Sequence, residues 1–82
     1  METRVAVMSI IVENGNTVDA LNALLHDYSD CIIGRMGIPY RQKGINIISI
    51  ALDAPQDQIS ALAGKIGNLP GITVKTALAN LV

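Results

Sequence analysis

The sequence predicts an α+β fold in which a four-stranded antiparallel sheet carries two helices on one face, in the order βαββαβ. Three observations lead to this prediction. The chain has 82 residues, enough for one hydrophobic core and no second one. Hydrophobic residues make up 50% of it, and four apolar segments are interspersed with two segments of helical periodicity. We therefore expect a single domain over residues 1–82.

The first half of the chain contains a strand, a helix and a second strand. Residues 5–12 are apolar except for Ser9, which is typical of a strand covered on both faces. Residues 14–16 end this strand and lead into a helix. Its apolar side chains recur at helical spacing: Val18, Leu21, Leu24, Leu25 and Tyr28. Residues 31–38 form the second strand, in which glycines at 34 and 37 indicate a bulge or another irregularity.

The second half follows after a hairpin loop at residues 39–44. Residues 45–53 are apolar at successive positions, so this third strand is expected at the centre of the sheet. Pro55 fits the first turn of a second helix, and a turn at residues 69–71 leads into a fourth strand at residues 72–78. Two strand–helix–strand units joined by a hairpin give the ferredoxin-like sandwich, because right-handed crossovers place both helices on one face.

The face of the sheet without helices is expected to be apolar as well. Successive side chains point to opposite faces of a strand, and both sets are apolar in the first and third strands. A contiguous apolar face is typical of an interaction surface, and its burial stabilises an assembly. We therefore predict a homodimer or a higher oligomer that forms through the sheet. The predicted interface residues are Met8, Ile10, Val12, Ile48 and Ile50.

Composition and charge exclude several classes of function. The net charge is −1, from six Lys plus Arg and seven Asp plus Glu, so no positive field gathers nucleic acid or an acidic membrane. The apolar segment at residues 5–12 is too short to span a membrane and precedes no cleavage site, so we expect a cytoplasmic protein. Cys31 has no second cysteine with which to form a disulfide or a metal-binding pair.

No catalytic or metal-binding constellation is evident. His26 lies out of phase with the apolar stripe of its helix, and nothing places it beside a serine as a general base. His26 and Cys31 could supply at most two ligands to a metal ion. The aspartates lie at predicted helix ends and turns, where capping accounts for them. The sequence therefore predicts neither an enzyme nor a cofactor.

Two segments are candidates for binding a small effector. Asn14, Gly15 and Asn16 precede the first helix and offer backbone N–H groups and amides to an anionic ligand, although ordinary turns use the same residues. The second segment places a cation and a flexible thioether between two glycines, as Gly34, Arg35, Met36 and Gly37. It can form a pocket, an interface or a bulged edge strand with a solvated arginine. This region also contains three cations, Arg35, Arg41 and Lys43. Either they converge to bind a carboxylate or phosphate, or they lie on a solvated surface.

Several segments also carry a resemblance to a known family. They are Arg4-Val5-Ala6-Val7, Leu24-Leu25-His26-Asp27-Tyr28, residues 32–40 (IIGRMGIPY), Ile47-Ile48-Ser49-Ile50, Leu52-Asp53-Ala54-Pro55 and Leu69-Pro70-Gly71. Over almost its whole length the chain resembles the ACT-like proteins named as regulators of an iron-only hydrogenase system. The resemblance implies a regulatory protein of the ACT-like fold, related to ACT domains and to the ligand domain of nickel-responsive repressors.

The resemblance also suggests where an effector would bind. ACT domains bind amino acids at subunit interfaces near the loop after the first strand, and residues 14–16 occupy the matching place, although the usual Asp and Pro-Gly of that loop are missing. The nickel relatives use several histidines and a cysteine, whereas this chain has one His. No DNA-binding segment precedes Val5, so transcriptional control would require a partner protein.

Two functional hypotheses follow. The first is a homo-oligomeric regulator that binds a small effector or a partner protein at a subunit interface, near residues 14–16 and 34–37. The alternative is an assembly module that docks a partner protein through its sheet face without any small ligand.

Overall fold

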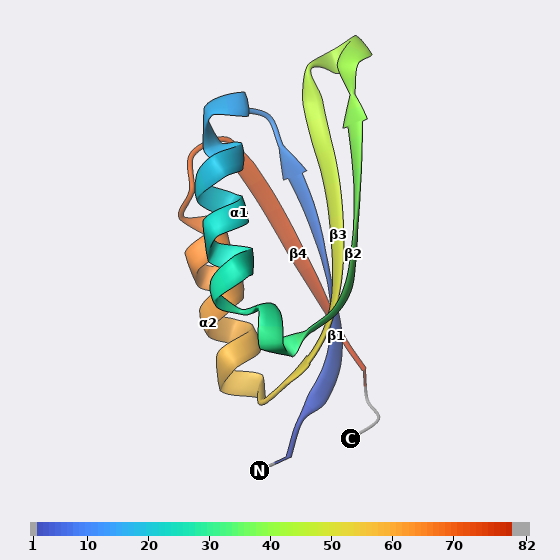
Figure 1. Ribbon diagram of the computed structural model, residues 1–82, viewed down its shortest axis with the longest axis vertical. Helices are drawn as coiled ribbons and strands as arrows, with labels where there is room; N and C mark the ends of the chain where they lie inside the picture. Colours follow the sequence, from blue (N-terminus) through green and yellow to red (C-terminus); the bar gives the residue numbers. More distant parts are fainter. Residues whose placement is uncertain (1, 80–82) are drawn as a thin grey trace.

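Four strands form one antiparallel sheet, in the order β2-β3-β1-β4, and both helices lie on the same face of it (Figure 1). The computed structural model describes residues 2–79, so Met1 and residues 80–82 of the predicted domain lie outside the described residues. The strands and helices are β1 (Arg4–Val12), α1 (Val18–Asp27), β2 (Ile32–Tyr40), β3 (Ile45–Ala54), α2 (Gln56–Gly67) and β4 (Ile72–Leu78). Short 3-10 turns join them, namely η1 (Gly15–Thr17), η2 (Ser29–Cys31) and η3 (Arg41–Lys43). The predicted βαββαβ fold is confirmed.

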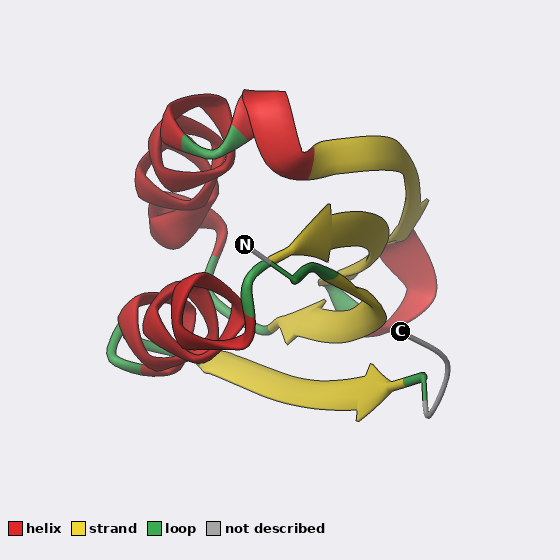
Figure 2. Cartoon of the chain, turned by 90° about the horizontal axis from the view of Figure 1, so that it is seen from below, coloured by secondary structure: helices red, strands yellow, loops and turns green. Residues whose placement is uncertain are grey.

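The two central strands, β1 and β3, provide the sheet side of the core. They pair antiparallel with Met8 opposite Ile50 and Ile10 opposite Ile48, so these side chains point to the same face. That face lies beneath the helices, which contribute Leu21 and the other buried residues of their apolar stripes to one cluster. The helix residues buried in it are Leu21, Leu25, Ile59, Leu62 and Ile66. Figure 2 shows both α-helices on one side of the strands, and no α-helix of the described chain lies on the other side.

This arrangement corrects the predicted oligomer interface. The five residues proposed for it are at most 6% exposed and belong to the core beneath the helices: Met8, Ile10, Val12, Ile48 and Ile50. The prediction chose the wrong face because both sets of alternating side chains on β1 and β3 are apolar. For the same reason, the expectation that β1 is covered on both faces is wrong within the described chain, since Val5, Val7 and Ile11 are about 40% exposed.

The second strand contains the irregularity that its glycines indicated. Ile32 pairs with Leu52 and Gly34 with Ala51, so Ile33 is an extra residue on β2. A bulge of this kind is common on edge strands, and it leaves the Ile33 side chain 64% exposed. The strand also continues to Tyr40, two residues into the predicted hairpin loop, because β2 is an edge strand, where proline is tolerated.

Tyr28, the residue that follows α1, contacts Lys65 of α2. The Lys65 ammonium donates a hydrogen bond to the Tyr28 hydroxyl at 3.0 Å and lies 5.2 Å from the centre of the ring. This hydrogen bond, followed by the electrostatic interaction with the same side chain, raises the pKa of Lys65 above its ordinary value of 10.5.

The assignment of faces predicts different effects for two neighbouring residues of β3. Ile50→Ala removes buried methyl groups and leaves a cavity, so we expect it to lower the free energy of unfolding by about 2–5 kcal/mol. Ser49→Ala, one position along on the opposite face, should change it by less than about 0.5 kcal/mol. Urea denaturation of both variants measures the difference. Equal effects would contradict this assignment of faces.

The raised pKa of Lys65 predicts a pH-dependent contact. Because the folded pKa exceeds the unfolded one, the contact stabilises the fold below pH 10.5 and the stabilisation is lost as the pH rises through the folded pKa. Tyr28→Phe removes the acceptor and should lower the pKa of Lys65, as followed by an NMR titration of its side chain. Tyr40→Phe is the matched control, since that hydroxyl bonds Gln42, and it should leave the titration of Lys65 unchanged.

Candidate functional site

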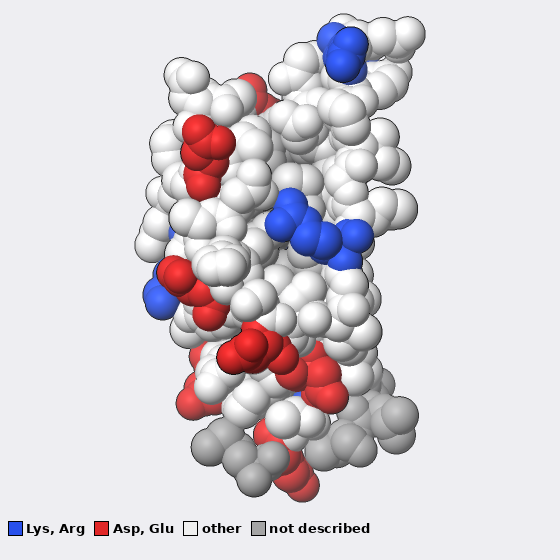
Figure 3. All heavy atoms as spheres, viewed as in Figure 1, with Lys and Arg blue, Asp and Glu red and all other residues white. Residues whose placement is uncertain are grey.

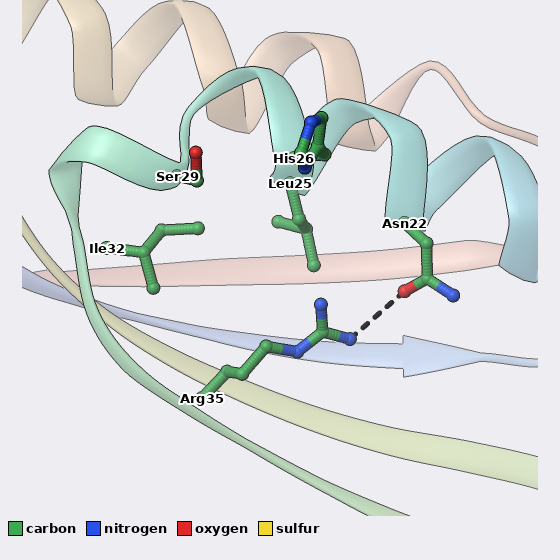
Figure 4. A pocket seen from close by; sticks show the side chains of 6 residues that line it. All are labelled: Asn22, Leu25, His26, Ser29, Ile32 and Arg35. Atoms are coloured by element: carbon green, nitrogen blue, oxygen red, sulfur yellow. Dashed lines mark hydrogen bonds between the residues drawn. The ribbon is translucent and has the colours of Figure 1, made fainter.

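A groove of about 300 Å³ lies between α1 and the edge strand β2. Its lining residues come from α1, η2 and β2, and Figure 4 shows how they lie: Asn22, Leu25, His26, Ser29, Ile32 and Arg35. Leu25 is buried and Ile32 is half-buried, so they give the groove an apolar floor. The other four lining side chains carry polar groups. A volume of this size is at the lower end of the range for small-molecule sites.

Arg35 reaches into this groove because of the register of β2. It pairs with Ile50, whose side chain is buried beneath the helices, so Arg35 projects to the helix side as well. Its Nη2 donates a hydrogen bond to Asn22 Oδ1 at 3.0 Å. This bond joins residues 13 positions apart in the sequence and links the edge strand to α1 across the groove.

The other members of the predicted segment at residues 34–37 are divided between the two faces. Gly34 pairs with Ala51 and Met36 with Ser49, so both lie on the face without helices. Gly37 pairs with Ile48, which places it on the helix side with Arg35. A Cβ on Gly37 would meet nothing within 4 Å, so the strand beside Arg35 leaves open space.

The three predicted cations do not converge. Arg41 and Lys43 lie in η3 at the end of the hairpin, whereas Arg35 lies in the middle of β2, and six residues of extended chain span about 20 Å. In Figure 3, basic atoms at the end of the hairpin are separate from a basic side chain that crosses the hollow between the helical side and the sheet. Arg35 is therefore the cation that the groove contains.

The other predicted ligand segment, residues 14–16, packs against the turn that precedes β4. Asn14 Oδ1 accepts a hydrogen bond from the backbone N–H of Asn16 at 3.0 Å. The hydroxyl of Thr17 donates to the carbonyl of Pro70 at 2.7 Å, and the N–H of Glu13 donates to the carbonyl of Gly71 at 2.7 Å. These residues contribute nothing to the lining of the groove. Ligand binding at Asn14, Gly15 and Asn16 stays a prediction.

His26 and Cys31 have different surroundings in the structure. His26 lines the groove, whereas the Cys31 thiol donates to Gln58 Oε1 at 3.5 Å. Within residues 2–79, no group of three or more His, Cys, Asp or Glu side chains is arranged to hold a metal ion. In the same part of the chain, no helix has the length and apolar character needed to cross a membrane.

The second candidate surface is the face of the sheet without helices. We call it the open sheet face and define it by seven large apolar side chains that are 39–59% exposed: Val5, Val7, Ile11, Met36, Ile38, Tyr40 and Ile47. They come from β1, β2 and β3, and the register keeps them on one side, with Ile38 opposite Ile47 and Ile47 opposite Ile11. A contiguous apolar surface of this kind is unusual on a monomer.

Comparison with known families and structures identifies the chain's relatives. The TM1266-like family, described as "Iron-only hydrogenase system regulator, putative", matches residues 4–76. The chain belongs to this family. The solved structure of protein TM1266 from Thermotoga maritima is similar to the chain over 96% of this chain and 100% of that one, with 35% identity and a TM-score of 0.92. No curated protein matches the sequence.

More distant structures share the fold alone. A formyltetrahydrofolate deformylase from Pseudomonas putida KT2440 matches 93% of this chain and 29% of its own, with 17% identity and a TM-score of 0.65. An unknown protein from Galdieria sulphuraria matches 99% of this chain and 48% of its own, with 20% identity and the same TM-score. The chain therefore corresponds to about a third and about half of these two proteins, respectively.

The packing of residues 14–16 against the turn at Gly71 predicts a large effect of a small substitution. Gly71 has φ +70°, and a Cβ there would lie 2.6 Å from the Cβ of Asn14. Gly71→Ala therefore adds a steric clash to the strain of a left-handed residue, and we expect a loss of about 2–5 kcal/mol in thermal or urea unfolding. Gly44→Ala is the control, since Gly44 has φ +65° with open space around it, and it should cost only about 1–2 kcal/mol.

Proposed function

We propose that this protein is a homo-oligomeric regulator in which a second copy of the chain covers the open sheet face. Membership of a family described as regulators supports the regulatory part of the proposal. The open sheet face is the single observation that supports self-association, and it replaces the buried residues that the sequence indicated.

The size of the open sheet face is in the range that a dimer needs. A half-exposed aliphatic side chain leaves on the order of 70 Å² of apolar surface in water, so the seven side chains leave on the order of 500 Å². A standard interface buries about 800 Å² on each partner, including its polar rim. Burying this apolar area on two copies, at about 25 cal/mol per Å², contributes a favourable free energy on the order of 20 kcal/mol. The loss of translational and rotational freedom on association costs about 4–15 kcal/mol.

The chemistry of the open sheet face favours a second copy as its occupant. Between the large side chains lie small neutral ones, Ser9, Ser49 and Ala51. The register places two charged residues on this face, the acidic Asp53 opposite Val5 and the basic Lys75 of β4 opposite Ser9. A surface with so little charge offers no electrostatic match to an acidic or basic partner. It is complementary to a like surface, since two twisted sheets pack face to face about 10 Å apart.

The regulatory role rests on binding and not on catalysis. The groove contains one histidine, His26, and none of the side-chain hydrogen bonds found among the described residues involves it. A small effector that binds the folded chain, or a change in assembly, can alter the surface that a partner protein sees. We infer that control of an iron-only hydrogenase system passes through such protein contacts.

The proposed dimer predicts that one charge introduced into the open sheet face prevents self-association. Val7 lies at the centre of the open sheet face, between Ala51 and Ala77 on the adjacent strands. Val7→Glu would place an unpaired carboxylate in the dimer interface, so we expect a monomer where the wild-type chain sediments as a dimer across the micromolar range. Ala23→Glu adds the same charge on the exposed surface of α1 and should leave the dimer intact.

The same sedimentation experiment decides against the proposal in two ways. A wild-type chain that stays monomeric at every micromolar concentration rules out the second copy as the occupant, and the surface then fits a partner protein. Dissociation by Ala23→Glu as strongly as by Val7→Glu would contradict an interface confined to the open sheet face.

A further inference from the structure

We propose that the groove between α1 and β2 binds a small organic monocarboxylate through the guanidinium of Arg35. The proposal rests on the proposed function in that such a ligand would be the effector of the regulator. It moves the effector site from residues 14–16, which lie against the turn at Pro70 and Gly71, to the middle of β2.

The guanidinium of Arg35 is available to an anion. Among the described residues it makes one hydrogen bond, to the neutral amide oxygen of Asn22. A guanidinium carries five N–H donors in a planar fork that matches a carboxylate with two parallel hydrogen bonds. The bond to Asn22 fixes the direction of the side chain across the groove, and the remaining donors stay open to a ligand (Figure 4).

The surroundings of Arg35 select the kind of anion. Leu25 and Ile32 line the groove beneath the polar groups, so a short aliphatic body gains by contact with them. Ser29 adds a hydroxyl that can donate a further hydrogen bond. The volume of about 300 Å³ limits the ligand to a few carbon atoms.

The charged residues of the groove favour a ligand that carries one negative charge and no positive charge. Arg35 is the sole Lys or Arg among the lining residues, and the chain carries a net charge of −1, so a doubly charged phosphate would be only half compensated. No described carboxylate lines the groove, so an ammonium group on the ligand would find no counter-charge there. A short-chain fatty acid anion meets both conditions.

The test measures the binding of butyrate by NMR titration of the isotopically labelled full chain at constant ionic strength. We expect saturable shifts of the Ser29, Ile32 and Arg35 signals at roughly millimolar butyrate, because six non-hydrogen atoms supply limited binding energy. Butyramide has the same shape without the charge, and its affinity should be at least about tenfold lower, as expected for the loss of a charge-assisted pair.

Two arginine variants provide the matched comparison. Arg35→Gln should weaken butyrate binding at least about tenfold, whereas Arg41→Gln removes the same charge from the exposed hairpin end and should change it by less than about twofold. Arg35→Lys keeps the positive charge but lacks the planar guanidinium, so its affinity for butyrate should lie between those of Arg35→Gln and Arg41→Gln. Arg35 is exposed, so we expect these variants to fold, and their amide spectra check this.

Three outcomes overturn the proposal. They are the absence of saturable shifts with any of acetate, butyrate and hexanoate, equal binding of butyrate and butyramide, and equal loss of binding in Arg35→Gln and Arg41→Gln. Repeating the titration on Val7→Glu separates this proposal from self-association. If a monomeric variant binds butyrate, the groove works without the dimer, and if a dimeric wild type does not bind it, the dimer stands and the groove proposal fails.

Discussion

The structure depends on the pleat of β1 and β3, the two central strands. Successive side chains of a strand point to opposite faces, and both sets on these strands are apolar, whereas the two helices cover one face only. Met8, Ile10 and Ile50 lie on the covered face and are fully buried. Val7, Ile11 and Ile47 lie on the other face and are about 40% exposed. One set of aliphatic residues therefore holds the helices to the sheet, and the other remains exposed in the described chain.

Periodicity was sufficient to predict the order of the elements and their approximate ends. The helical stripes, the glycine irregularity in β2 and the turn at Gly71 are local features, and local chemistry determines them. The choice between the two faces was not local. Met8 and Val7 are both apolar, and only the packing of the helices decides which of them is buried. A one-residue error in this choice moves the whole predicted interface to the opposite face, which is why the prediction failed.

The groove could not be read from the sequence for a related reason. Arg35 is noticeable beside its glycines, but Asn22, its hydrogen-bond partner, is an ordinary exposed helix residue 13 positions earlier. Ile32 and Arg35 both lie on the helix side because the bulge at Ile33 interrupts the alternation. Strict alternation from Ile32 would instead direct Arg35 to the open sheet face. Residues 14–16 have the composition of a ligand loop, and they also pack against the turn at Gly71. The same residue types are common in ordinary turns, so composition alone does not distinguish the two roles.

The bulged strand also relates the two proposed sites to each other. Arg35 faces the groove and Met36, its neighbour, faces the open sheet face, so a displacement of β2 on one side necessarily moves a side chain on the other. Edge strands have one paired neighbour and shift more readily than central ones. If a carboxylate binds the dimer more tightly than the monomer, dimerisation must increase the affinity for the carboxylate by the same factor, because linkage is reciprocal. A carboxylate with equal affinity for both states would leave the assembly unchanged however tightly it bound, since only a difference in affinity shifts an equilibrium.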